Sequence, residues 1–213
     1  MGMVVQLTWA LGMAMALGLV GGGPSAPPRL AALPSSRYVS GVPLAEPHSN
    51  WCGPAALAAV LQFHGEKAAA AEIARDIYLP GYRGALNLDL LLWARKRGLE
   101  VWAGRGSAPE VKRALVRNRP VICLVRRHGR LADRNHFVVV RGYDDSRRIW
   151  LLDDGSGKEH AASGAGFERD WQECGRWMMV VEGKGRASEG ERESDQHPLS
   201  AGAGRAAGRV PDR

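Results

Sequence analysis

The chain has 213 residues, of which 45% are apolar, enough for one domain of ordinary size with a packed core and flanking segments. Its formal net charge is +7, and the positive surplus lies in two central runs, residues 112–119 and 126–134. Neither run has interleaved aromatic residues and no nucleic-acid-binding motif occurs, so we expect no nucleic-acid partner. A basic groove for acidic or peptide ligands, or a solvated basic surface, fits the pattern better.

The chain begins with an uncharged apolar run, residues 4–20, followed by the small residues and prolines of "GGGPSAPP". This pattern is typical of a secretory signal peptide cleaved near Ala26, or of an N-terminal membrane segment. We therefore expect residues 1–26 to direct export to the periplasm or the cell exterior, or to hold the protein at a membrane through the apolar run. Residues 27–41 are rich in Pro and Ser, which indicates a linker.

Four helices are predicted in the first half of the domain, at about residues 52–64, 68–78, 87–97 and 107–115. Pro54 lies in the first turn of the first helix, where its missing N–H costs nothing. Asn87 and Ser107 are the expected caps of the third and fourth helices. Ser107 and Glu110 also have the spacing of a capping box.

The second half of the domain has the short apolar runs and turn signals of strands, at about residues 99–103, 121–125, 136–143, 148–153 and 177–182. The stretch "YDDSRR", residues 143–148, predicts a hairpin between two of them. Helices followed by a mostly antiparallel sheet indicate an α+β domain over residues 42–182. Residues 183–213 have almost no large apolar side chains, so we expect a disordered tail.

Three cysteines occur, and no two have the spacing of a zinc site, so the sequence implies no metal and no cofactor. Cys123 and Cys174 flank strand-like runs and are interpreted as small buried residues, with a disulfide between them as an alternative in an exported chain. Cys52 is different because it lies at the expected start of a helix. There the unpaired N–H groups favour the thiolate and can also stabilise an oxyanion.

A nucleophilic cysteine needs a base, and His136 is the best candidate among the six histidines. It begins the apolar run "HFVVVRGYD", where a sheet would fix its direction, whereas the others fall in loops, at a helix end or in the tail. The next strand ends in Asp153 and Asp154. If these strands pair across the 143–148 hairpin, the acidic pair lies beside His136, where a carboxylate orients the imidazole.

The blocks "NWCGPAALAAVL", "HFVVVRGYD" and "WLLDDGSG" resemble, in order and spacing, the motifs of the C39-type cysteine peptidases. These are papain-like proteases that include the leader-removing domains of bacteriocin exporters. "DIYLPGYRGALNLDLLLWARKRGLEVW" and "FERDWQECGRWMMVV" are similar to a stand-alone, exported subgroup. The resemblance covers residues 42–182 and implies a papain-like α+β fold and a peptide or protein substrate. It also implies Cys52 as nucleophile, His136 as base and Asp153, rather than Asp154, as orienting carboxylate.

The sequence departs from the family just before the nucleophile. The family usually has a Gln five or six residues before the Cys, whose amide stabilises the oxyanion, whereas this chain has Glu46 in "EPHSNW". Either Asn50 or His48 replaces the Gln, or the Cys52 N–H acts alone, or peptidase activity is impaired. We therefore keep three hypotheses: a C39-like cysteine peptidase, a weak or inactive peptide-binding module, and a thiol acyltransferase. The sequence leaves the oligomeric state open.

Overall fold

The computed structural model describes residues 32–48, 50–129 and 132–184. The expected export segment, residues 1–26, lies outside these ranges, as do residues 185–213 of the expected tail, whereas its first two residues, Gly183 and Lys184, end a strand. Within the described ranges, none of the helices has both the length and the apolar character needed to cross a membrane.

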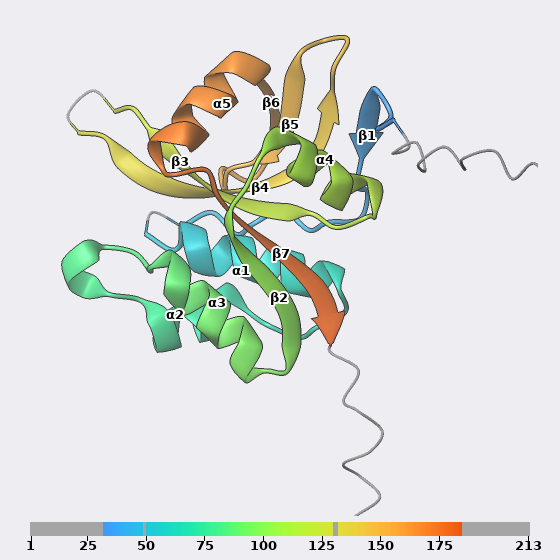
Figure 1. Ribbon diagram of the computed structural model, residues 1–213. Helices are drawn as coiled ribbons and strands as arrows, with labels where there is room; N and C mark the ends of the chain where they lie inside the picture. Colours follow the sequence, from blue (N-terminus) through green and yellow to red (C-terminus); the bar gives the residue numbers. More distant parts are fainter. Residues whose placement is uncertain (1–31, 49, 130–131, 185–213) are drawn as a thin grey trace, which may run out of the picture. The chain divides into compact units, whose positions relative to one another are not determined.

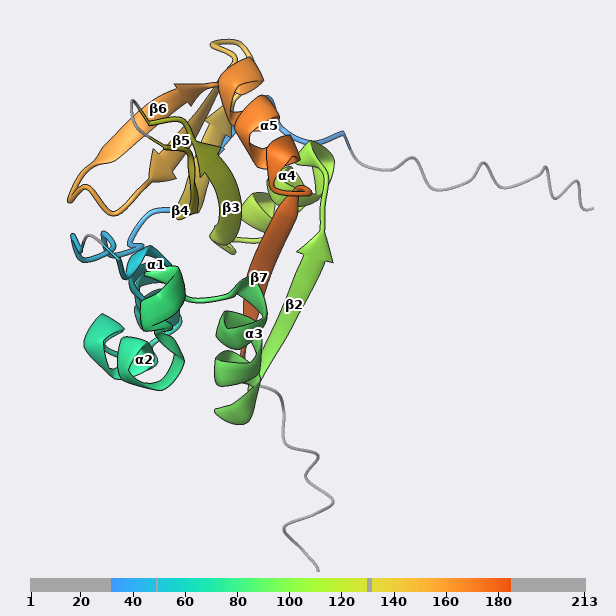
Figure 2. The ribbon, with the colours of Figure 1, turned by 90° about the vertical axis from the view of Figure 1, so that its left-hand side faces the viewer.

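An antiparallel sheet forms the centre of the domain (Figures 1 and 2). Its strands follow the spatial order β2–β7–β3–β4–β5–β6, and β1 pairs with the far end of β4. The strands are β1 (Ser36–Tyr38), β2 (Leu99–Arg105), β3 (Val121–Arg127), β4 (Arg134–Asp144), β5 (Ile149–Asp153), β6 (Glu159–Ser163) and β7 (Trp177–Lys184). The five strands that the sequence predicts are all present.

Five α-helices pack around this sheet: α1 (Cys52–Phe63), α2 (Ala70–Ile77), α3 (Asn87–Lys96), α4 (Ala108–Val116) and α5 (Gly164–Glu173). Helices α1, α2 and α3 gather on one side, and α4 and α5 lie on the other (Figure 1). A short 3-10 helix, η1 (Pro80–Tyr82), joins α2 to α3. The arrangement confirms the predicted α+β class, with the four predicted helices preceding most of the sheet.

Helix α1 is the central helix of the domain. Every residue from Gly53 to Leu61 is buried, because α2 and α3 cover it from one side and strands β3 and β4 from the other. A helix buried on every side needs a continuous apolar run without a polar stripe. The run "GPAALAAVL" supplies it, and its small residues allow close approach of the neighbouring elements. The start of α1 is therefore held rigidly.

Strands β1 and β6 and helix α5 were not predicted from the sequence. Strand β1 lies within residues 27–41, expected to be a linker, so the last part of that segment belongs to the fold. Strand β6 pairs with β5 and includes His160, one of the histidines that the sequence predicts to lie in a loop. Helix α5 has two glycines in its first turn, and because glycine has a low helix propensity, the sequence does not indicate a helix there. Its start is stabilised by the Ser163 Oγ, which accepts a hydrogen bond from the Gly166 N–H at 3.2 Å.

The β4–β5 hairpin forms as predicted and sets the register of the site. Asp144 pairs with Ile149 beside the turn, and Val139 pairs with Asp153 at the other end. The Asp144 carboxylate accepts hydrogen bonds from the Ser146 hydroxyl and the Arg147 N–H, as expected of a turn-forming residue. The far end of β5 consequently lies beside the middle of β4, three residues after His136.

Candidate active site

A cleft of about 860 Å³ runs between the helical part of the domain and the start of β4. Cys52 lines it from the first residue of α1, and His136 lines it from the third residue of β4. Both side chains are half-buried. The structure thus brings the predicted nucleophile and the predicted base, 84 positions apart in sequence, to the walls of one cavity.

Cys52 is at the N-terminus of α1, as predicted. The first hydrogen bond of the helix runs from the Ala55 N–H to the Trp51 carbonyl at 2.8 Å. The N–H groups of Cys52 and Gly53 precede this bond, so they have no acceptor within the helix. They form a positively polarised end beside the Cys52 thiol, as oxyanion stabilisation requires.

The His136 ring is fixed by a main-chain acceptor. Its Nε2 lies 2.7 Å from the carbonyl oxygen of Asp154. A carbonyl only accepts hydrogen bonds, so in the neutral ring Nε2 carries the proton and Nδ1 keeps its lone pair. Burial lowers the pKa of His136, with the charges of Arg127 and Arg134 acting in the same direction, against the opposing effect of the Asp154 hydrogen bond. The neutral, proton-accepting form of the ring is therefore favoured.

Asp153 lies at the end of β5, but its carboxylate faces other partners. Its Oδ2 accepts a hydrogen bond from the Ala45 N–H at 2.6 Å, and its Oδ1 accepts one from the Gly155 N–H at 2.9 Å. The side chain is almost completely buried, with 1% of its surface exposed. Among the described hydrogen bonds, none joins this carboxylate to His136, so its predicted orienting role remains a prediction.

Asp154 connects three strands at this end of the sheet. Its carbonyl binds His136 of β4, while its carboxylate binds the Arg127 guanidinium of β3 at 2.5 Å and the Ser156 N–H at 3.0 Å. Burial acts to raise the pKa of Asp154, but the Ser156 hydrogen bonds and the Arg127 charge outweigh it and lower that pKa. The side chain is therefore an anion near neutral pH.

The segment leading to the nucleophile is anchored to the sheet at two points. The buried Arg141 donates to the Val42 carbonyl at 2.7 Å, and Asp153 accepts from the Ala45 N–H. Glu46, His48 and Asn50 follow these anchors, and all three line the cleft. The predicted substitutes for the missing Gln are therefore within the site.

His48 and Asn50 are ordered against one another. The His48 ring stacks on Trp51 with ring centroids 3.7 Å apart, and its Nδ1 accepts from the Asn50 N–H at 3.3 Å. Nδ1 is then an acceptor, so the neutral His48 ring carries its proton on Nε2. The half-buried Asn50 side-chain amide has no hydrogen-bond partner among the described residues, which leaves its N–H groups free to bind a ligand.

The loop around η1 forms the wall of the cleft on the helical side. Leu79 and Gly84 close it by two backbone hydrogen bonds, of 2.8 and 3.4 Å. Tyr82 and Arg83 project from it and line the cleft, and Tyr82 is 77% exposed. Arg83 has a φ of 52°, in the left-handed region that non-glycine residues seldom adopt. The sequence "LPGYRG" indicated a turn here but not its place beside Cys52.

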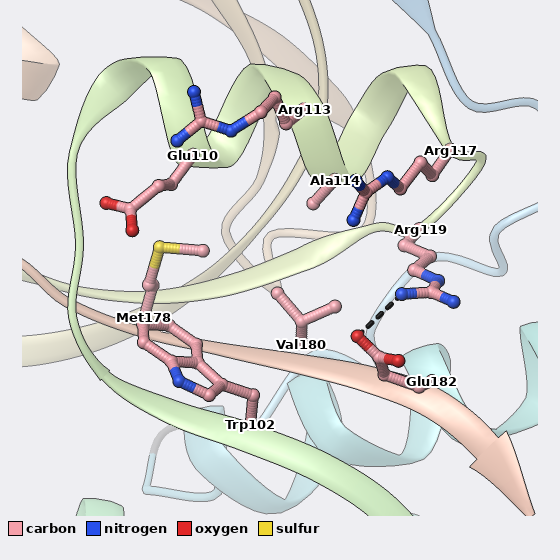
Figure 3. Close-up of a pocket in the computed structure, with 9 residues that line it drawn as sticks. All are labelled: Trp102, Glu110, Arg113, Ala114, Arg117, Arg119, Met178, Val180 and Glu182. Atoms are coloured by element: carbon pink, nitrogen blue, oxygen red, sulfur yellow. Dashed lines mark ion pairs between the residues drawn. The ribbon is translucent and has the colours of Figure 1, made fainter.

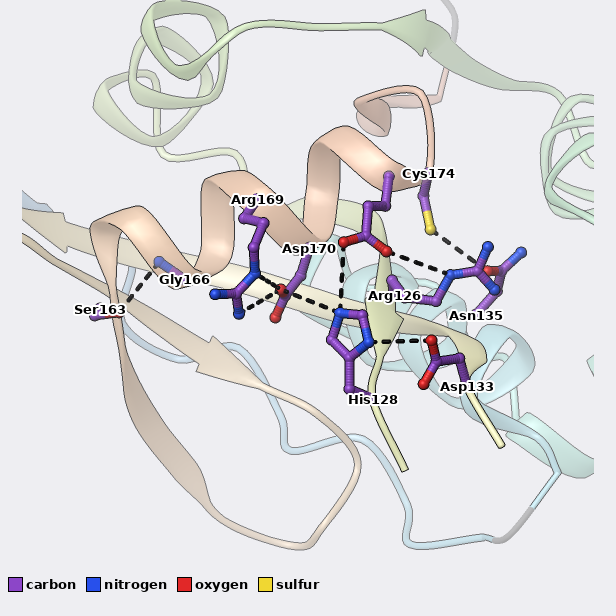
Figure 4. Close-up of polar contacts among 10 residues, drawn as sticks. Arg126, His128, Asp133, Asn135, Ser163, Gly166, Arg169, Asp170 and Cys174 are labelled. Atoms are coloured by element: carbon purple, nitrogen blue, oxygen red, sulfur yellow. Dashed lines mark hydrogen bonds and ion pairs between the residues drawn. The ribbon is translucent and has the colours of Figure 1, made fainter. Parts of the chain in front are cut away.

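Polar contacts tie the β3–β4 hairpin, which carries His136, to α5 (Figure 4). His128 lies between Asp133 of the hairpin, at 3.1 Å, and Asp170 of α5, at 3.8 Å. The Cys174 thiol, just after α5, lies 3.5 Å from the Asn135 side-chain oxygen. Cys174 and Cys123 are both free thiols, so the disulfide considered as an alternative is not formed.

Known proteins resemble the chain in sequence and in fold. The model of the Peptidase_C39 like family matches residues 37–179. The peptidase domain of Streptococcus ComA, described as a bifunctional ABC transporter involved in quorum sensing, has 22% identity and a TM-score of 0.54, covering 66% of this chain and 98% of that one. A C39-like peptidase described as putative, from Bacillus anthracis, has 17% identity and a TM-score of 0.56, covering 71% and 99%.

A third solved structure is a double glycine motif protease from an AMS/PCAT transporter, in complex with its leader peptide. It has 20% identity and a TM-score of 0.54, covering 68% of this chain and 93% of that one. No curated protein sequence matches the chain. At these identities the structural likeness concerns the fold, which is the papain-like arrangement expected from the sequence.

Proposed function

The chain belongs to the Peptidase_C39 like family, and on this premise we propose that it is a cysteine peptidase that hydrolyses peptide bonds with Cys52 and His136. The observation that carries the proposal is the Nε2 contact of His136 with the Asp154 carbonyl. It leaves Nδ1 as the proton acceptor of a ring that shares its cleft with the Cys52 thiol. Covalent catalysis by a cysteine requires at least a thiol nucleophile and a base that takes its proton, and this cleft contains both.

In the first half of the reaction, His136 Nδ1 takes the proton of the Cys52 thiol, and the sulfur attacks the carbonyl carbon of the substrate peptide bond. The carbon–nitrogen bond then breaks, and His136 returns the proton to the leaving amine. A thioester between Cys52 and the N-terminal part of the substrate remains. In the second half, water gives a proton to His136 and its oxygen attacks the thioester carbon. The carbon–sulfur bond then breaks, the acid is released, and His136 returns the proton to the Cys52 sulfur.

The negative oxygen of each tetrahedral intermediate needs donors. The Cys52 N–H at the start of α1 is one, and Asn50 or His48 is the second in our proposal. This assignment is supported by their places in the cleft and by the free amide of Asn50. Glu46, at the position where the family has Gln, accepts but does not donate when it is ionised.

We assign the orientation of His136 to the Asp154 main chain. A carbonyl at hydrogen-bond distance fixes the ring direction and the tautomer, which is what the third member of a triad does. It lacks the full negative charge that stabilises an imidazolium in other triads. Asp153 contributes indirectly in this scheme, because its carboxylate fixes Ala45 at the base of the segment that leads to Cys52.

The substrate we propose is a peptide or an unfolded protein segment, of which leader peptides with a double glycine motif are one candidate. The complex of a similar protease with its leader peptide supports a peptide ligand. The alternative is a peptide-binding module with weak or no activity. The observation that favours this alternative is Glu46 in the position of the missing amide.

A peptide-library digestion tests the proposal. Wild-type protein is expected to release new N-termini that Cys52→Ala does not, while Cys174→Ala, which removes a thiol outside the cleft, is expected to cleave like wild type. Product mixtures read by mass spectrometry identify the cut bonds. A thiol-reactive peptide electrophile provides the second readout. If it labels Cys52 in a protein that cleaves nothing, the site is a binding module or uses an amine acceptor instead of water.

A further inference from the structure

The cleft contains more positive than negative charge near His136. Four arginines line it, Arg83, Arg126, Arg127 and Arg134, against the two carboxylates of Glu46 and Asp154. Arg127 binds Asp154 at 2.5 Å, and Arg126 lies 3.8 Å from Glu173 of α5. Arg83 and Arg134 have no carboxylate partner among the described residues, and Arg134 is the nearer of the two to His136 in sequence.

The register of the hairpin places Arg134 on the same face as the base. Arg134 and His136 are two residues apart in β4, so their side chains project from the same side of the strand. Arg127 is the direct partner of Arg134 across the β3–β4 ladder and belongs to the same face. The charges of both arginines act on His136, whose pKa they help to lower. Arg134 is therefore about 7 Å along the strand from His136.

Like charges directly opposite one another in a sheet are destabilising. The Arg127–Arg134 pair has one carboxylate, from Asp154, and that carboxylate is bound by Arg127. The other acidic groups near the hairpin, Asp133 and Asp170, lie beside His128 rather than Arg134 (Figure 4). One positive charge on the His136 face of the hairpin thus lacks an anion within the described structure.

We propose that Arg134 selects substrates with an acidic side chain within the first three residues after the cleaved bond. The inference rests on the proposed function, because His136 protonates the amine that leaves. The peptide beyond that amine passes His136, and its next residues reach Arg134, since an extended chain advances about 3.3 Å per residue. A substrate carboxylate at that position would pair with Arg134, while Asp154 remains paired with Arg127.

The test measures binding first, so that it does not depend on turnover. Full-length Cys52→Ala protein is titrated into fluorescent ten-residue peptides of one small-residue core, with Asp, Asn or Lys in the three positions after the central bond. We expect the Asp peptide to bind about three- to tenfold more tightly than the Lys peptide at low salt, as for a partly exposed ion pair. The difference should shrink when the salt concentration is raised to 0.5 M.

Charge variants made on the Cys52→Ala background assign the effect to one residue. Arg134→Glu is expected to invert the preference, and Arg134→Lys to keep it. Arg117→Glu is the control, because it makes the same charge change outside the cleft. Arg117 lines a separate concavity of about 200 Å³ between α4 and strands β2 and β7, which shares no lining residue with the cleft (Figure 3). This variant should leave the preference unchanged. Circular dichroism and thermal melts confirm that each variant folds.

Equal binding of the Asp and Lys peptides, or an unchanged preference in Arg134→Glu, would overturn the proposal. The position of the acidic residue is read from wild-type digestion of the peptide library, where Asp and Glu should be enriched in the first three residues of the C-terminal products. Enrichment on the N-terminal side instead would also overturn it. If wild type cleaves nothing, the proposed peptidase function fails, while the binding comparison still decides whether Arg134 selects acidic peptides.

Discussion

Gly53 of α1 lies against the ring of Phe137 of β4 so closely that a Cβ atom on Gly53 would be 3.0 Å from Phe137 Cδ2. Gly53 follows the nucleophile and Phe137 follows the base. This contact therefore sets how near the helix with the thiol approaches the strand with the imidazole. The same Cβ would lie 3.2 Å from a methyl group of Leu90 in α3, so the helix cannot shift away without moving a second element.

We expect Gly53→Ala to lower both stability and activity. Because the added methyl group would lie 3.0–3.2 Å from side-chain atoms of Phe137 and Leu90, these neighbours must shift. The free energy of unfolding should then fall by about 1–3 kcal/mol, as for other overpacked cores. Activity should fall further than stability explains, since Cys52 and His136 move apart. Urea unfolding and kcat/KM measure the two effects.

Gly81→Ala is the matched control, because a Cβ there meets nothing within 4 Å. Phe137→Leu, which removes ring atoms facing Gly53, should restore part of the loss in the double variant. Additive losses in the double-mutant cycle would contradict the steric explanation.

Asp153→Asn is predicted to act mainly on stability. An amide has one acceptor oxygen for the two N–H groups, of Ala45 and Gly155, that the carboxylate now binds. One buried group loses its partner, which costs about 1–3 kcal/mol. Urea unfolding tests this. An unchanged unfolding free energy with a large loss of kcat would instead support Asp153 as the orienting carboxylate.

Asp154→Asn should leave most of the catalytic rate intact. The substitution keeps the main-chain carbonyl that binds His136. It removes the negative charge that pairs with Arg127, whose side chain is 58% exposed, and that lies 3.8 Å from His160. Such pairs contribute about 1 kcal/mol or less. We expect kcat to fall by less than about tenfold, by analogy with the loss of a partly exposed charge. A loss comparable to that of His136→Ala would show that the carboxylate itself takes part.

Arg127→Gln is predicted to move the acidic limb of the pH–rate profile to higher pH. The rate should be lost as pH falls through the pKa of His136, which is below the ordinary value of about 6.5. Removing Arg127 removes a repulsive charge and frees the Asp154 carboxylate to attract the imidazolium, so both effects raise the pKa of His136. The pH dependence of kcat/KM measures the shift. Arg117→Gln should not move the limb, and a downward shift in Arg127→Gln would refute the argument.

The three thiols should react at different rates with iodoacetamide near neutral pH. Burial raises the pKa of Cys123 well above its ordinary value and also raises that of Cys174. The thiolate is the reactive form, so Cys123 should stay unlabelled until the protein unfolds and Cys174 should react slowly. Cys52, in the open cleft, is expected to react first. Peptide mapping by mass spectrometry at timed intervals gives the order, and rapid labelling of Cys123 in folded protein would contradict the structure.

The β4–β5 hairpin could be predicted from the sequence. The turn residues 143–148 and two apolar strands predict a hairpin that brings the end of β5 close to His136. In the structure Asp153 pairs with Val139, in the middle of β4, and the Asp154 carbonyl reaches His136. The partner of the imidazole was harder to find. An acidic residue can be identified in a sequence as a possible partner of a histidine. Every residue has a main-chain carbonyl, so nothing in the sequence distinguishes the carbonyl of Asp154 as the acceptor.

Elements held by distant contacts were also missed. Strand β1 has three residues and exists because β4 makes room for it: a Cβ atom on Gly142 would lie 2.7 Å from the Arg37 carbonyl oxygen. In α5, Phe167 and Trp171 have the four-residue spacing of a buried helix face, and this spacing with Ser163 as cap was the available signal. The glycines of its first turn obscured it.

An acceptor supplied by the main chain has a consequence for how this site is studied. Substitution scanning changes side chains only, so no scan position removes the Asp154 carbonyl. Replacing the peptide link between Asp154 and Gly155 by an ester would weaken that oxygen while keeping both side chains. It also removes the Gly155 N–H that donates to Asp153, so Asp153→Asn serves as the control for that second loss. The importance of this contact can therefore be tested by chemical synthesis but not by side-chain mutagenesis.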